Sequence, residues 1–516
     1  MTSKNIKMLA AKVPNREKII ELSRREYIHL ESDELNGIED LFGQLISAAN
    51  TVGILTQKMS RSKDPARESG YKPDQKEDPY NAFIRKISIR GSGHGLLTGK
   101  KIGIKDNIAV RGIPMTNASD LSKDFVPDYD ATIVTRLLEA GGEIVGKMNL
   151  DNYSFSGTSE TSIFGPVHNP LNPEYSPGGS SSGSGAAVAS GQVDIAIGVD
   201  QGGSARVPAS CCGVVAIKPT QGVVPTYGLT YMDHSFDHIS PIAHTVVDAA
   251  TTLSVIAGPD KNDPQWSRST LSAPVDYRKE IETPIPESFR IGFVTESVTW
   301  EATDPEIKEC FQAALGRLRT LGAKISEVSI PLFKESGSIW ITIVVQSTHA
   351  MFDSCGGGYW NGGQYSPEWN EHIGRARKER ADLYPPLLKG SMLIGRYLRE
   401  EYYSIFHSMA QNLRNKLRDD VDAALEQVDI LATPTMIVKP PKLKEKITFS
   451  ESLNRGVLLL NNTEGFNLTG HPAITIPCGM RGGLPVGLQL IGKRLDEAML
   501  FRIARLFERR FNWREL

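Results

Sequence analysis

Hydrophobic residues recur at helical spacing among charged residues over the first part of the chain, from Arg16 to about Met59. Such a pattern predicts amphipathic helix. The next stretch, from Ser60 to Asn81, is polar and contains three prolines, which is typical of a linker or surface loop. We therefore expect a helical N-terminal region with a linker over residues 1–84 and a separate main region over residues 85–516.

From Lys101 onward, short apolar runs alternate with amphipathic helical patterns. We expect strands at residues 100–110, 194–200, 290–296, 430–435, 472–479 and 487–492. We expect helices at residues 304–322, 397–417 and 496–511, and one that begins at residue 131 and ends at the Gly pair 141–142. Strands that alternate with helices in this way favour a layered α/β architecture. No internal repeat of fixed period is evident.

Composition and charge narrow the range of functions. The chain has 516 residues, with 58 Lys and Arg against 60 Asp and Glu, a net charge of −2. A chain without basic excess is a poor nucleic-acid binder, so we expect no nucleic-acid partner. No apolar run reaches the roughly 20 residues of a membrane span, and no secretory signal is evident, so we expect no membrane partner and a cytoplasmic location.

The five cysteines are scattered and form no C-x-x-C pair. Such cysteines are typical of small buried side chains in a reducing compartment. Neither the cysteines nor the histidines show the spacing of a metal site. We therefore expect no metal and no cofactor.

Two Gly/Ser-rich stretches, residues 176–190 and 200–208, are the candidates for chemistry. Residues 179–183 satisfy G-x-S-x-G, which would make Ser181 the nucleophile of a histidine-dependent α/β hydrolase. That motif must follow a strand directly, but here a segment with three prolines precedes it. The alternative stays open at this point.

Lys105 and Ser204 suit a different chemistry. Apolar strand residues flank Lys105 and would bury it, and a desolvated lysine becomes a neutral base that accepts a proton directly or through a second hydroxyl. Ser204 follows a strand-like run and Gly202-Gly203. The backbone N–H groups of Gln201, Gly202, Gly203 and Ser204 could form an oxyanion hole there. Asp151 and Thr158 are candidates for lining a substrate pocket.

These motifs resemble the amidase signature family. The resemblance rests on GIKDNI around Lys105, GGSSSGSGAAVA around Ser180 and DQGGSARVP around Ser204, and on the separation of 24 positions from Ser180 to Ser204. FNLTGHPAITIPCG and GLPVGLQLIG near the C-terminus also resemble the family. Ser182 stands where the family usually has Gly, and Ala205 where it usually has Ile or Val. The resemblance covers roughly residues 85–516.

The resemblance implies a Ser-cisSer-Lys triad. Ser204 attacks a carbonyl carbon, Ser180 (after a cis peptide bond) relays the proton, and Lys105 is the base. It also implies an α/β/α sandwich with a central mixed sheet covered by helices.

Gln201 and the N-terminal extension look most like the nitrile-pathway amidases, whose extension helps to form a homodimer. The expected function is cleavage of small carboxylic amides to acid and ammonia through an acyl-enzyme. The first alternative is carbamate (urethane) hydrolysis by the same triad. The second is an amidotransferase-type subunit, or a noncatalytic member, that binds a partner. The expected partners are a small amide or carbamate substrate and a second copy of the chain in a homodimer or higher oligomer.

Overall fold

The computed structural model describes residues 10–57, 66–263, 275–359, 362–444 and 447–516. The chain divides into two compact units, Met1–Pro65 and Ala66–Leu516. In the first unit the predicted helical run consists of two helices, α1 (Arg16–Arg25) and α2 (Ser32–Gln57). The chain turns between them at Tyr27, whose φ of 59° lies in the left-handed region that a helix cannot continue through.

The division between the units falls after Pro65, earlier than the boundary at residue 84 expected from composition. Residues 58–65 lie outside the described residues, so the predicted linker is seen only from Ala66 onward. Within it, Tyr71 and Lys86 exchange two backbone hydrogen bonds of 3.0 and 2.8 Å. The Asp78 carboxylate accepts a bond from the backbone N–H of Phe83 at 2.8 Å. These contacts fix a polar segment to the first strand of the second unit.

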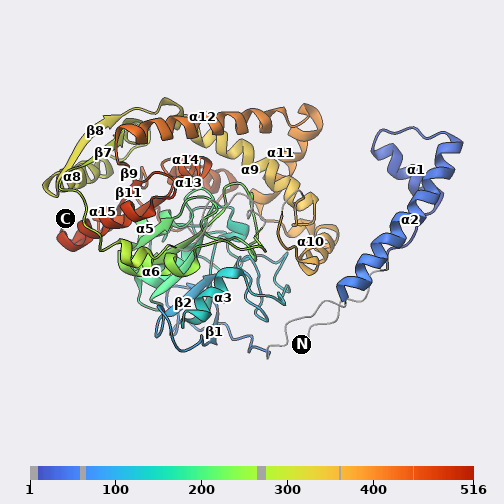
Figure 1. The fold of residues 1–516 in the computed structure, drawn as a ribbon, viewed down its shortest axis with the longest axis horizontal. Coiled ribbons are helices and arrows are strands. Elements are labelled where there is room, and N and C mark those ends of the chain that lie inside the picture. The colour runs from blue at the N-terminus through green and yellow to red at the C-terminus, as the bar shows by residue number, and fades with distance from the viewer. Residues whose placement is uncertain (1–9, 58–65, 264–274, 360–361, 445–446) are drawn as a thin grey trace. The chain divides into compact units, whose positions relative to one another are not determined.

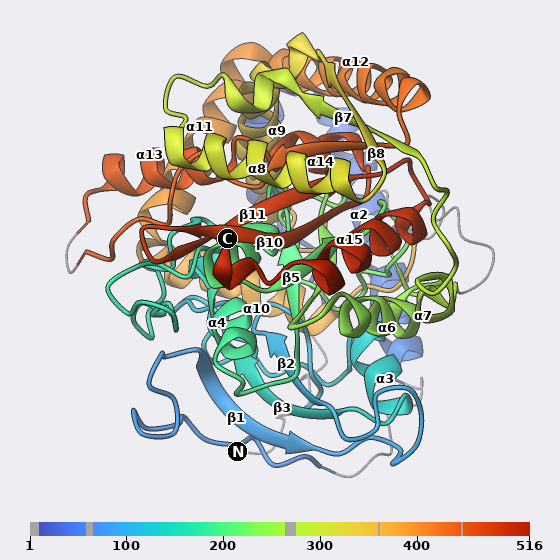
Figure 2. The same ribbon diagram turned by 90° about the vertical axis from the view of Figure 1, so that its left-hand side faces the viewer.

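A mixed sheet forms the centre of the second unit. Its strands are β1 (Phe83–Ile89), β2 (Lys101–Lys105), β3 (Glu143–Met148), β4 (Ile195–Asp200), β5 (Val215–Lys218), β6 (His238–Ala243), β7 (Phe289–Val294), β8 (Ala323–Val328), β9 (Ile430–Pro434), β10 (Ala473–Arg481) and β11 (Leu484–Ile491). Among the described residues these make one 11-stranded sheet in the order β1-β3-β2-β4-β6-β5-β10-β11-β9-β7-β8. Figure 2 shows it from β1 at the bottom to β7 and β8 at the top.

The pairings are parallel between β2 and its neighbours β3 and β4, and between β7 and its neighbours β8 and β9. The other pairings are antiparallel. The predicted strands therefore form a mixed sheet, as expected from the resemblance.

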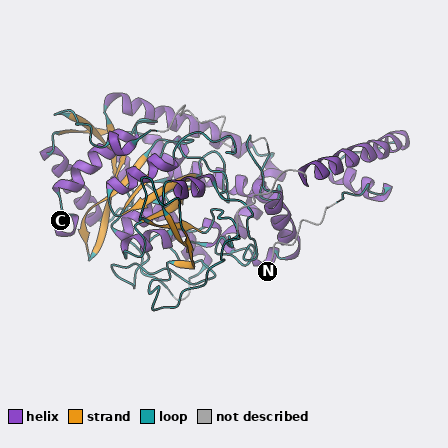
Figure 3. Cartoon of the chain, turned by 60° about the horizontal axis from the view of Figure 1, so that its bottom comes forward, coloured by secondary structure: helices purple, strands orange, loops and turns teal. Residues whose placement is uncertain are grey.

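Helices cover both faces of this sheet (Figure 3). The described helices of the second unit are α3 (Thr132–Glu139), α4 (Ser182–Ala189), α5 (Arg206–Cys212), α6 (Val246–Ile256), α7 (Tyr277–Glu280), α8 (Pro305–Thr320), α9 (Ser336–Asp353), α10 (Pro367–Glu379), α11 (Pro386–Tyr402), α12 (Ile405–Gln427), α13 (Phe449–Leu460), α14 (Glu464–Thr469) and α15 (Glu497–Arg510). One apolar cluster joins α3, α6, α8 and α15 to side chains such as Ile195 and Ile197, whereas α4 and α5 belong to another cluster together with Ala196. Alternate residues of a strand point to opposite faces, so the unit has three layers.

The long helix expected over residues 397–417 is interrupted. Tyr403 and Ser404, with φ of 53° and 58°, separate α11 from α12. Figure 1 shows the chain reversing there, with α12 returning across the unit beside α9. Hydrophobic spacing continues across the break, so the pattern alone gave no signal of the turn.

Candidate active site

Lys105 is the last residue of β2, and Asp200 is the last residue of β4. The two strands are parallel neighbours, with Ile104 beside Ile197. The carboxyl ends of parallel strands meet at one edge of a sheet, where binding sites form in α/β proteins. The topology therefore brings the two candidate motifs of the sequence, around residues 105 and 200–208, to one place.

The Lys105 ammonium group is completely buried. Its Nζ lies 2.8 Å from Oγ of Ser180. Burial lowers the pKa of Lys105 to about 7, although the nearby carboxylates of Asp151, Asp200 and Asp237 act in the opposite direction. An amine with this pKa is largely neutral just above pH 7 and can accept a proton.

Ser180 lies in the turn before α4, and the peptide bond between Gly179 and Ser180 is cis. A side chain at position 179 would collide with Asp151, because its Cβ would lie 2.1 Å from Oδ2. The Ser180 carbonyl accepts a bond from the backbone N–H of Asp151 at 3.2 Å. Residues 176–188 of the Gly/Ser-rich tract are thus a buried part of the site.

Ser204 lies in the turn between β4 and α5. It retains 6% of its surface, whereas Lys105 and Ser180 retain none. Its carbonyl accepts a 3.0 Å bond from the N–H of Ser181, which ties the two serine loops together. Over the described part of the chain, no hydrogen bond joins the Ser204 and Ser180 hydroxyls directly. Ser204 is therefore the member of the predicted triad that a substrate can reach.

The turn around Ser204 depends on glycine. Gly203 has φ of +134°, and a Cβ there would lie 2.1 Å from Oγ1 of Thr463. Its N–H donates to Asp200 Oδ1 at 2.8 Å, so this donor is already used within the loop. The N–H groups of Gln201, Gly202 and Ser204 make no backbone hydrogen bond among the described residues. The predicted four-donor oxyanion hole is reduced to these three candidates.

A buried ion pair holds the same turn. Arg206 and Asp200, both without exposed surface, approach to 2.9 Å. Burial alone would raise the pKa of Asp200, but the Arg206 guanidinium, with a hydrogen bond from Asn467, holds it below its usual range. Arg206 also donates to Oε1 of Gln489 and Oδ1 of Asn467, both at 2.6 Å.

Sequence reasoning missed Thr463, Asn467 and Gln489 as parts of this site. They lie more than 250 residues after Arg206, on α14 and β11 or beside them. The only signal was that the stretches FNLTGHPAITIPCG and GLPVGLQLIG, which contain Asn467 and Gln489, resemble the family. Trp340 of α9 was also missed. Its Nε1 donates to the carbonyl of Gln201 at 2.8 Å, and its ring lies so close to Gly202 that a Cβ there would be 2.9 Å from it.

Ser181, the alternative nucleophile, is unsuited to attack. Its hydroxyl is completely buried, donates to the Val199 carbonyl at 3.1 Å and accepts from the Val199 N–H at 3.2 Å. Within the described residues, no histidine is hydrogen-bonded to Ser181 or Ser204. The histidine-dependent hydrolase hypothesis therefore lacks its base.

Asp151 and Thr158 lie against Gly179, beside the two serine loops. Asp151 is buried and accepts bonds from the N–H of Ser159 at 3.0 Å and from the Thr161 hydroxyl at 2.8 Å. Burial raises its pKa to about 6. Both residues thus hydrogen-bond within their own loop, and direct contact with a substrate stays a prediction.

In the ranges that the structure describes, no cluster of three or more His, Cys, Asp or Glu side chains has the arrangement of a metal site. No helix in these ranges is both long enough and apolar enough to cross a bilayer. The location of the protein in the cell stays a prediction.

Comparison with known proteins identifies relatives of the chain. The family model Amidase matches residues 82–501. The chain is 40% identical over 432 residues to a glutamyl-tRNA(Gln) amidotransferase subunit of Halobacterium salinarum, covering 83% of this chain and 99% of that protein. It is 36% identical over 447 residues to an enantioselective amidase of Rhodococcus rhodochrous, covering 86% and 85%. The crystal structure of the corresponding glutamyl-tRNA(Gln) amidotransferase subunit from Thermotoga maritima superposes with a TM-score of 0.69 at 34% identity, covering 84% and 88%.

The chain belongs to the amidase family, whose members act on C–N bonds, and the fold expected from the resemblance is confirmed. Two of these three relatives are amidotransferase subunits. The comparisons therefore favour the amidotransferase alternative over the hydrolysis of small free amides, which was the main prediction from the sequence.

Proposed function

We propose that this protein cleaves the C–N bond of a carboxylic amide through an acyl-enzyme on Ser204. The observation that carries the proposal is the 2.8 Å contact between the buried Lys105 amine and the Ser180 hydroxyl, together with the lowering of the lysine pKa to about 7. A buried neutral amine beside a hydroxyl can accept the hydroxyl proton and so act as a general base.

In the acylation step, the Ser204 hydroxyl adds to the carbonyl carbon of the amide. Its proton passes to the Ser180 oxygen while the Ser180 proton passes to Lys105 Nζ. The N–H groups of Gln201, Gly202 and Ser204 stabilise the negative oxygen of the tetrahedral intermediate. Lys105 then returns its proton through Ser180 to the amide nitrogen, the C–N bond breaks and an amine or ammonia leaves. Water hydrolyses the ester at Ser204 by the same relay.

The fate of the nitrogen separates two forms of this function. In an amidotransferase, ammonia passes to an acceptor with the help of partner chains, and the 40% identity over nearly all of the halobacterial subunit supports this form. In a free-standing amidase the ammonia is released. That form is supported by the location of Lys105, Ser180 and Ser204 in one unit of one chain and by the Rhodococcus relative. Carbamate cleavage would use the same relay and differ only in its leaving group.

Ammonia release by the purified full-length chain tests the shared chemistry. The substrates are glutamine, acetamide, benzamide and ethyl carbamate, and Ser204→Ala is the matched control. Turnover that is lost in Ser204→Ala is expected, and turnover that persists in this variant would overturn the proposal. Release from acetamide or benzamide by the chain alone supports the amidase form. Release that needs co-purifying chains and glutamyl-tRNA, with glutamine as donor, supports the amidotransferase form.

We also propose that the N-terminal unit pairs with a second copy of the chain. Apolar residues recur along α2 at alternating steps of three and four, at Ile38, Leu41, Leu45, Ala48, Val52 and Leu55. This is the a/d spacing of a coiled-coil seam. Leu45, Val52 and Leu55 are each more than half exposed, at 60%, 62% and 56%. A helix with such a face gains stability by burying it against another.

A further inference from the structure

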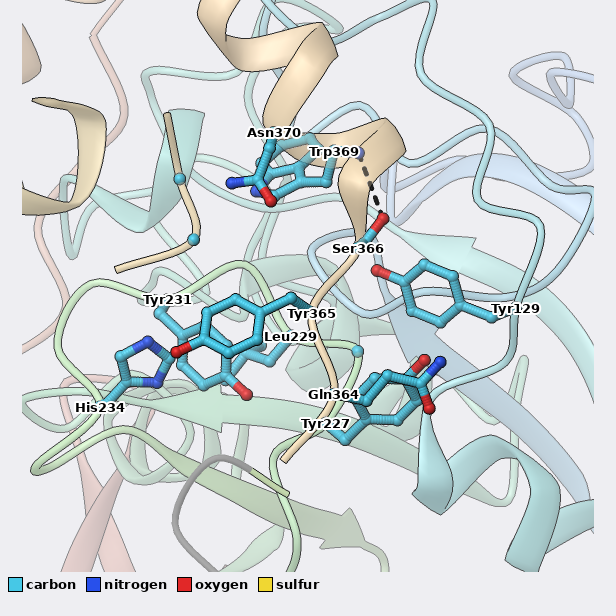
Figure 4. A pocket seen from close by; sticks show the side chains of 13 residues that line it. Tyr129, Tyr227, Leu229, Tyr231, His234, Gln364, Tyr365, Ser366, Trp369 and Asn370 are labelled. Carbon is cyan, nitrogen blue, oxygen red and sulfur yellow. Dashed lines mark hydrogen bonds between the residues drawn. The ribbon is translucent and has the colours of Figure 1, made fainter. Parts of the chain in front are cut away.

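An aromatic pocket in the second unit has no part in the triad. It lies among Tyr129 before α3, the loop between β5 and β6, and the segment that leads into α10. The aromatic residues that line it are Tyr129, Tyr227, Tyr231, His234, Tyr365 and Trp369. Figure 4 shows the tyrosines and Trp369 arranged around a common space.

The rings are held close to one another. The Tyr129 and Tyr227 ring centroids are 5.3 Å apart, and those of Tyr231 and His234 are 3.8 Å apart. Burial raises the pKa of Tyr129 to about 12 and that of Tyr227 above its usual value, so both phenols are neutral at physiological pH. The faces of neutral Tyr and Trp rings carry partial negative charge and attract cations.

Three carboxylates act on the buried tyrosines of the pocket. The negative charges of Asp128 and Glu368 help to raise the pKa of both Tyr129 and Tyr227. Asp260 helps to raise the pKa of Tyr227 as well. In the described part of the chain, no Lys or Arg nitrogen lies within 4.0 Å of the carboxylates of Asp128, Asp260 or Glu368. Asp260 acts to raise the pKa of Arg136 on α3, against the larger effect of burial, but the Arg136 guanidinium donates its hydrogen bonds to the backbone carbonyls of residues 256–259. The surroundings therefore favour a positively charged occupant.

The wall of the pocket is connected to the catalytic segment. The N–H of Thr230, between the lining residues Leu229 and Tyr231, donates to the carbonyl of Asn107 at 2.9 Å. Asn107 comes two residues after Lys105. The pocket wall is therefore hydrogen-bonded to the segment that directly follows the proposed base.

We propose that this pocket binds an organic ammonium cation, such as a quaternary alkylammonium group, by cation–π contact with its tyrosines and Trp369 and by attraction to Asp128, Asp260 and Glu368. The cation is either a remote group of the amide substrate or a separate small ligand. The proposal concerns binding and needs no turnover, so it stands or fails separately from the proposed function.

Calorimetric titration of the full-length protein with choline tests it. The neutral isostere 3,3-dimethyl-1-butanol has the same shape without the charge. Choline is expected to bind at least about tenfold more tightly than the isostere, because a desolvated cation–π site discriminates by about this much. Equal affinities, or no binding of choline at millimolar concentration, would overturn the proposal.

Variants at Tyr365 localise the binding. This side chain is 40% exposed, so its replacement leaves the core intact. Tyr365→Leu is expected to weaken choline binding about fivefold, whereas Tyr365→Phe retains it because the ring face remains. Tyr403→Leu, a change at an 84% exposed tyrosine outside the pocket, is the matched control. Unchanged binding in Tyr365→Leu, or equal loss in Tyr403→Leu, would place the cation elsewhere and refute the assignment.

Kinetics then identifies the source of the cation. If the cation belongs to the substrate, an amide with a remote trimethylammonium group has a lower KM than its tert-butyl isostere, and free choline competes with it. If the cation is a separate ligand, choline binds equally well when the active site is saturated with a neutral amide. Either result supports the proposal that the pocket binds an organic cation. If choline neither competes with the cationic amide nor binds to the enzyme saturated with a neutral amide, the proposal is contradicted.

Discussion

Asp200 and Arg206 form an ion pair that is completely removed from solvent and that spans the turn bearing Ser204. The Asp200 carboxylate also accepts the backbone N–H groups of Gly203 and Ala205 at 2.8 and 3.2 Å. Both neighbours of Ser204 in the chain are thus bound to one carboxylate. The pair holds in place the backbone that carries Ser204, the proposed nucleophile, and the candidate oxyanion donors.

Arg206→Met should therefore destabilise the fold strongly. It leaves the Asp200 charge buried without its partner, which typically costs about 3–5 kcal/mol. Denaturant unfolding measures the change. Arg290→Met is the matched control, since it removes one partner of the exposed pair with Asp429 and should cost about 1 kcal/mol or less. Equal effects of the two substitutions would show that the buried pair has no special role.

Replacement of the triad residues should abolish activity while the fold persists. We expect Ser204→Ala to lower kcat/KM by about 10³-fold or more and Lys105→Ala by about 10²–10⁴-fold, the range for loss of a nucleophile or general base. Ammonia release and circular dichroism measure the two properties. Folded Lys105→Ala protein with full activity would be incompatible with the proposed relay.

Activity should rise with pH through the pKa of Lys105, about 7. Only the neutral amine accepts a proton, so kcat/KM is expected to increase about tenfold per unit below this pKa and to level off above it. A pH–rate profile of the full-length protein measures the rise. A profile that falls between pH 6 and 8 would contradict a neutral lysine base.

Asp151→Asn should shift that rise toward lower pH. The Asp151 carboxylate stabilises the Lys105 ammonium, and it is the strongest of the charges that raise the lysine pKa. Removing its charge lowers the lysine pKa further, whereas the asparagine oxygen can still accept hydrogen bonds from the loop around Ser159. A shift toward higher pH would mean that Asp151 does not act on Lys105 through its charge.

Leu45→Glu should disrupt self-association, because a charge on the α2 seam would have to be buried. Light scattering after size exclusion measures the mass of the full-length protein. Ser47→Glu is the matched control, since it adds the same charge on α2 at an exposed residue outside the seam. A monomeric wild type, or equal dissociation by both variants, would exclude the seam as the interface.

The sequence alone determined the class of fold and indicated a candidate site. Alternating strands and helices predicted the α/β layers, local motifs singled out Lys105 and Ser204, and the resemblance to the amidase signature family added Ser180. These features depend on residues that are close together in the sequence, so hydrophobic spacing and Gly/Ser-rich turns are enough to indicate them.

Only the tertiary structure decided how those motifs meet. The parallel pairing of β2 with β4 brings residues 105 and 200 to one edge, and Asn467 and Gln489 reach Arg206 from the other end of the chain. Such contacts arise from packing between distant segments, and the burial that lowers the lysine pKa is a property of the assembled core. The helix breaks at Tyr27 and at Tyr403-Ser404, where the backbone enters the left-handed region within continuous hydrophobic patterns, were likewise decided by the fold.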